Sequence, residues 1–89
     1  MHTDEPIPVE RVQTGVRLEK RLLKVLKALA DLHDITLGDL LEGIVLHAFE
    51  GRSPFGPETL AQIADLKRVF GLDLDSNASH RLLSEEAPS

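Results

Sequence analysis

The segment from Thr36 to Gly51 constrains the fold most, because it is apolar around most of a helix's circumference. One side of this helix carries a stripe of apolar residues: Leu37, Leu40, Leu41, Ile44, Val45 and Ala48. Leu46 and Phe49 widen this stripe. A helix of this kind must be buried on several sides. The rest of an 89-residue chain is too small to cover it, so we expect a homodimer with a shared core.

The residues before this helix change their hydrophobic period at Glu19. Residues 11–18 alternate between apolar and polar, which predicts a short strand. From Glu19 onward the apolar residues follow helical spacing, which predicts a helix that ends near His33 and Asp34. Asp34 suits a left-handed position at the end of that helix. Thr36 followed by Asp39 predicts the start of the next helix, and Gly51 its end.

Four regions follow from this pattern. Residues 1–10, with Pro6 and Pro8, form an expected flexible arm, and residues 11–51 form the expected dimerisation and binding domain. Residues 52–71 hold a turn and a third helix that starts near Pro57 and ends before Gly71. Residues 72–89 form an acidic tail that we expect to be mobile.

The charge of the chain is unevenly distributed, although the net value is −5. Residues 11–27 carry six Lys and Arg against Glu19 alone, a local net charge of +5. Residues 35–51 carry three acidic residues and no Lys or Arg, and residues 71–89 carry four acidic residues against Arg81, so each has a net −3. The basic end is therefore the candidate for contact with nucleic acid, and the acidic remainder is not.

Composition excludes several classes of protein. The chain has no Cys, which removes disulfides and thiolate metal sites and fits a cytoplasmic location. It has no apolar run long enough to span a membrane, and we expect no membrane partner. Its four His residues lack metal-ligand spacing, and no nucleophile or phosphate-loop motif is present. We therefore expect no metal, no cofactor and no enzymatic activity.

The order of a short basic strand and two helices resembles the ribbon–helix–helix family of DNA-binding proteins. The resemblance covers about residues 11–50 and rests on three segments: Thr14-Gly-Val-Arg-Leu-Glu, Leu22-Leu-Lys-Val-Leu-Lys-Ala-Leu-Ala and Asp34-Ile-Thr-Leu-Gly-Asp-Leu-Leu. It implies a mainly α fold in which one N-terminal strand pairs across a homodimer, with two core helices and an additional C-terminal helix. It also implies a dimer that binds double-stranded DNA with this ribbon in the major groove.

The resemblance assigns roles to individual residues. Gln13, Gly15 and Arg17 would face base edges, where Arg suits guanine and Gln suits adenine, while Gly15 has no side chain to offer. Phosphate groups would lie at the second helix's N-terminus and beside the first helix, on Thr36, Leu37, Gly38, Lys20, Arg21 and Lys24. The shared dimer core would comprise Val12, Val16, Leu18, Leu22, Leu26, Leu29, Leu40, Leu41, Ile44 and Val45.

The residues and the family resemblance are compatible with three functions. The first is a transcriptional repressor that binds its operator as a dimer. The second is an antitoxin whose region 52–89 wraps a toxin protein. The third is a dimeric interaction module of the same fold that has lost DNA binding, which the net charge, Gly15 and Asp39 favour. The operator, any effector and the role of the third helix are not encoded in recognisable motifs.

Overall fold

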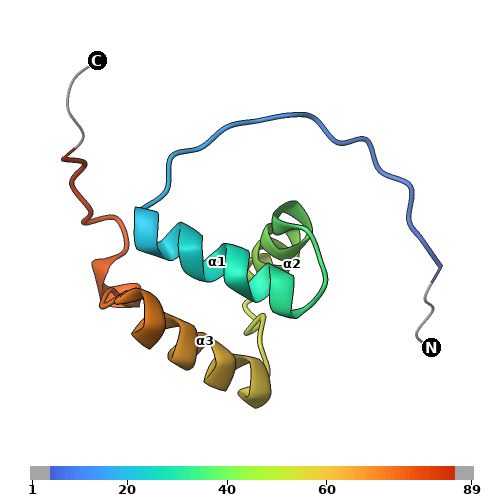
Figure 1. Ribbon diagram of the computed structural model, residues 1–89. Coiled ribbons are helices and arrows are strands. Elements are labelled where there is room, and N and C mark those ends of the chain that lie inside the picture. The colour runs from blue at the N-terminus through green and yellow to red at the C-terminus, as the bar shows by residue number, and fades with distance from the viewer. Residues whose placement is uncertain (1–4, 86–89) are drawn as a thin grey trace.

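The computed structural model describes residues 5–85 and contains three α-helices. These are α1 (Lys20–Leu32), α2 (Leu37–Phe49) and α3 (Pro57–Phe70), followed by a 3₁₀ turn, η1 (Ser76–Ala78). Helix α1 packs against both α2 and α3, and its chain direction is opposite to that of α3 (Figure 1). No helix within residues 5–85 is both long and apolar enough to cross a membrane.

The expected strand at residues 11–18 is wrong. Residues 5–18 run as an extended, exposed arm, which Figure 1 shows as a long arc leaving the start of α1, and no strand occurs within residues 5–85. A strand requires neighbouring backbone to pair its N–H and C=O groups, and no other segment of the described chain offers one. The ribbon–helix–helix fold is therefore corrected to an all-helical fold. Residues 1–4 of the predicted arm lie outside the described residues.

The predicted helix boundaries are confirmed by their capping interactions. The Glu19 side chain accepts a hydrogen bond from the Leu22 N–H at 2.9 Å, and the Thr36 hydroxyl accepts one from the Asp39 N–H at 3.0 Å. Asp34 has a φ of 59° between α1 and α2, and Gly71 has a φ of 68° at the end of α3. These contacts satisfy backbone groups that a helix end would otherwise leave unpaired.

The core lies where the three helices meet, and it is small. Its centre is Leu29 and Ala30 of α1 with Leu40 of α2, each at most 7% exposed. Half-buried residues surround this centre from both helices, the loops and α3: Leu26, Ile35, Ile44, Phe55, Ile63 and Leu66. Leu72, directly after α3, is also buried. The segment 72–85 thus begins with a buried anchor, and residues 86–89 of the predicted tail lie outside the described residues.

The apolar residues expected in a shared core divide into three groups. Leu29 and Leu40 are buried within the single chain, and Leu26, Leu41 and Ile44 are half-buried. Exposed members are distributed over the arm and both helices: Val12, Val16, Leu18, Leu22 and Val45. Helix α2 therefore has one face in the core, while Val45, Leu46 and Phe49 remain 42–80% exposed. The all-round apolar character of this helix is not satisfied within one chain.

Candidate nucleic-acid interface

The arm is tied to α2 by one bidentate ion pair. Arg11 donates from Nε and Nη2 to the two carboxylate oxygens of Glu42, at 2.9 and 2.8 Å. Both side chains are substantially exposed, at 66% and 45%. Two parallel hydrogen bonds fix direction as well as distance. Arg11 therefore positions the arm over α2, a role that the charge pattern alone did not reveal.

This pair shifts the pKa of both partners. The hydrogen bonds from Arg11 lower the pKa of Glu42, and the hydrogen bonds to Glu42 raise the pKa of Arg11. Because the pKa of Glu42 is lowered by folding, the pair stabilises the arm above the ordinary glutamate pKa. That contribution is lost as the pH falls through the lowered pKa, so acid releases the arm first at this point.

The middle of the arm and the start of α2 line a shared hollow of about 480 Å³. Gly15 of the predicted base-reading set borders it together with Leu37 and Gly38 of the predicted phosphate set, and Lys27 of α1 lies on its rim. Thr36 borders a neighbouring hollow with Thr14. The structure thus brings together two groups of predicted residues that are more than twenty positions apart in sequence.

Gln13 and Arg17 border neither of these two hollows, and both are exposed. Helix α1 continues the basic surface from the end of the arm. Lys20, Lys24 and Lys27 share one side of that helix at i, i+4 and i+7 spacing, and all three are exposed. Lys27 was not among the predicted phosphate contacts, although its spacing from Lys24 places it in the same row.

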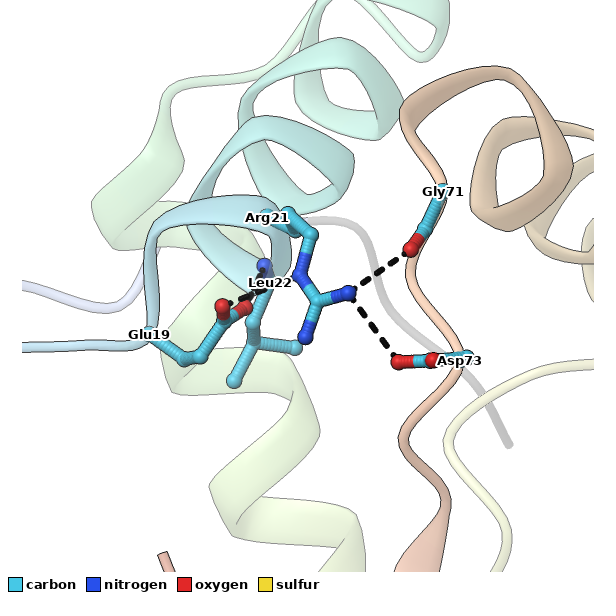
Figure 2. Close-up of polar contacts among 5 residues, drawn as sticks. All are labelled: Glu19, Arg21, Leu22, Gly71 and Asp73. Atoms are coloured by element: carbon cyan, nitrogen blue, oxygen red, sulfur yellow. Dashed lines mark hydrogen bonds and ion pairs between the residues drawn. The ribbon is translucent and has the colours of Figure 1, made fainter. Parts of the chain in front are cut away.

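Arg21, in contrast, is turned toward the end of α3 (Figure 2). Its Nε donates to the Glu19 carboxylate at 3.1 Å, and its Nη1 donates to the Gly71 carbonyl at 2.9 Å and to Asp73 at 3.0 Å. Hydrogen bonding to Glu19 raises the pKa of Arg21, and the Leu22 N–H lowers the pKa of Glu19. The predicted phosphate contact by Arg21 is thus occupied by the protein itself.

The start of α2 carries an opposing charge. Asp39 lies in the first turn and is exposed, and its own N–H donates to the Thr36 hydroxyl. Leu37 and Gly38 precede Asp39. The N–H groups in the first turn of a helix lack partners within the helix and can bind an anion. A phosphate at this point would meet the Asp39 carboxylate. The exposed lysines along α1 are therefore better placed for contact with a phosphate than the start of α2.

Comparisons of this chain with protein-family models, curated proteins and solved structures find no match.

Two of the four histidines, His33 and His47, take part in structural contacts. The ring of His33 lies 2.8 Å from the Gln62 side-chain oxygen, joining α1 to α3, and Nδ1 of His47 lies 2.7 Å from the Gly43 carbonyl one turn earlier. Across residues 5–85, no group of three or more His, Cys, Asp or Glu side chains is arranged to hold a metal ion.

Proposed function

We propose that this protein is a DNA-binding transcriptional regulator that acts as a homodimer in the cytoplasm. The observation that carries the proposal is the series of exposed basic residues at the end of the arm and along one side of α1. Arg17 lies on the arm, and Lys20, Lys24 and Lys27 follow it in a row along the helix. The acidic residues of α2 and of the segment after α3 lie outside this row, so the net charge of −5 does not describe the proposed contact surface.

The arm and the helix have different tasks in this proposal. The lysines contact phosphate groups, which supplies affinity that does not depend on sequence. Gln13 and Arg17 on the arm contact base edges, which supplies specificity. An extended arm next to a helix is a known way to reach a DNA groove without a strand pair. The start of α2 is not part of the proposed DNA contact, because its Asp39 carboxylate would repel a phosphate group.

The homodimer is supported by the amount of exposed surface. The chain exposes 8017 Å², whereas a compact monomer of 9.8 kDa exposes about 5,200 Å². Its radius of gyration is 15.1 Å, against about 12 Å for a compact chain of this length. The exposed arm of residues 5–18 and the uncovered face of α2 contribute to this excess of nearly 3,000 Å² per chain. A second copy that covers the arm and α2 would remove much of it.

The contact surface for the second copy is an apolar groove between the arm and α2. Ile7 and Val9 of the arm border it on one side, and Leu41, Val45 and Leu46 of α2 border it on the other. Its volume is about 540 Å³. We assign this groove to the dimer, because identical surfaces can pair around a two-fold axis and are always present at equal concentration.

Antitoxin activity is a second candidate, and exposed apolar residues in the region 52–85 favour it. Leu60 and Val69 are 49% and 72% exposed on α3, and Leu82 and Leu83 are 54% and 88% exposed after η1. Such residues would suit a toxin protein as partner. The same residues would also serve a module that binds only protein, and absence of DNA binding would favour that third alternative.

The row of lysines provides the test of the DNA-binding proposal. Changing Lys20, Lys24 and Lys27 to Gln is expected to reduce the slope of log affinity against log salt by about 5 for the dimer, since each lost phosphate contact contributes about 0.9 and the dimer carries two copies of each lysine. Fluorescence anisotropy with a labelled duplex at several salt concentrations measures this slope. The control variant changes Arg52, Lys67 and Arg68 to Gln, which removes the same charge elsewhere. Equal slopes for the two variants would contradict the proposed surface.

A further inference from the structure

Arg21 differs from the other basic residues of α1 because the end of the chain already holds it. The Gly71 carbonyl and the Asp73 carboxylate accept hydrogen bonds from the same nitrogen, Nη1, at 2.9 and 3.0 Å (Figure 2). These partners lie 50 and 52 positions away in sequence. A carboxylate on a guanidinium occupies the same donors that a phosphate would use. Asp73 therefore binds the donors of Arg21 that an anionic ligand would use.

The segment that supplies Asp73 is anchored independently of this ion pair. The Leu72 N–H donates to the Lys67 carbonyl at 2.8 Å, and the Leu72 side chain is 8% exposed. Gly71 closes α3 in a left-handed conformation. Asp73 itself is 81% exposed, and an exposed ion pair contributes little to stability. The anchored segment therefore holds Asp73 beside Arg21, while the ion pair itself is weak enough for another anion to displace it.

We propose that the segment 71–75 is an autoinhibitory element that competes with DNA for Arg21. The inference rests on the proposed DNA binding. Asp73 occupies Arg21 in the free protein, and a DNA phosphate displaces it when the basic surface of α1 docks on the duplex. Lys20 and Lys24 lie in the same turns of α1 as Arg21, so the Nη1 group released from Asp73 adds a donor beside an existing row of cations, while Nε keeps its bond to Glu19. The acidic segment thereby lowers affinity for DNA in general and leaves base selection to the arm.

The test compares Asp73→Asn with a variant of equal charge. Asp65→Asn on α3 removes a carboxylate that pairs with Arg68 and does not contact Arg21. For each chain that contacts a labelled duplex, Asp73→Asn is expected to raise affinity up to about fivefold over wild type and to steepen the salt slope by about 0.9. Asp65→Asn is expected to change both quantities by less. Circular dichroism confirms that each variant keeps its helices.

A second background separates competition from simple repulsion. In the Arg21→Gln variant, Asp73→Asn is expected to give no gain in affinity, because the competing partner is already absent. A gain that persists in this background, or equal gains from Asp73→Asn and Asp65→Asn, would overturn the autoinhibitory role while leaving DNA binding intact. Absence of binding by wild type and every variant at low salt would instead overturn the proposed function, and this inference with it.

Discussion

Replacing Leu29 with alanine is expected to lower the free energy of unfolding by about 3 kcal/mol. Leu29 is 1% exposed and lies at the centre of the small core between the three helices. The substitution removes three buried carbon atoms and leaves a cavity that the surrounding helices fill only in part. Because small domains are marginally stable, a large part of the population should unfold at moderate temperature. Urea unfolding followed by circular dichroism, at fixed protein concentration, measures the change.

The matched control is Leu32→Ala, in the same helix. Leu32 is 59% exposed, so the same chemical change removes few buried contacts. Its unfolding free energy should stay within about 0.5 kcal/mol of wild type. If the two variants were equally stable, the core would not be centred where α1 meets α2 and α3.

Replacing Val45 with aspartate is expected to weaken the dimer by about a hundredfold or more. Val45 borders the groove between the arm and α2 and is 42% exposed in the single chain. In the proposed dimer this position is covered, and the nearest cation of the groove, Arg11, is already bound to Glu42. A carboxylate that is buried here without a cation of its own costs about 3 kcal/mol or more. Sedimentation velocity over a range of protein concentrations measures the dissociation constant.

Leu60→Asp on α3 serves as the control for this prediction. Leu60 is 49% exposed, and the proposed dimer groove does not include it. The variant should therefore dimerise like wild type. A wild-type protein that sediments as a folded monomer at high concentration would contradict the dimer, and equal weakening by both variants would place the interface elsewhere.

The helices were predictable because their signals are local. Thr36 caps α2 through an N–H three positions later, and Gly71 ends α3 with its own backbone conformation. Such interactions involve neighbours in sequence, so periodicity and capping residues identify them. The prediction of a strand at residues 11–18 was wrong because strand formation depends on a partner that is not a sequence neighbour. Alternation indicates which side chains share a face, but a strand also needs paired backbone, and the described chain supplies no partner.

The candidate site was predictable only in part, because charge patterns do not reveal distant partners. The basic cluster was visible in the sequence, and Lys20 and Lys24 are exposed as expected. Arg11 and Arg21 belong to the same cluster, yet Glu42 and Asp73 bind them from 31 and 52 positions away. Glu42 reaches Arg11 because α2 packs beside the arm, and Asp73 reaches Arg21 because the end of α3 packs beside the start of α1. Arg11 and Arg21 are therefore engaged within the protein by carboxylates that are distant in sequence.

The most direct test of the account is the affinity of wild type and Arg17→Ala for the DNA upstream of the protein's own gene. A duplex of random sequence is the reference, and fluorescence anisotropy at two salt concentrations is the readout. We predict that wild type prefers the upstream DNA, weakens as salt rises, and loses about 1–3 kcal/mol of its preference in Arg17→Ala. Absence of wild-type binding to either duplex at low salt would contradict DNA binding, because phosphate attraction alone is detectable under those conditions.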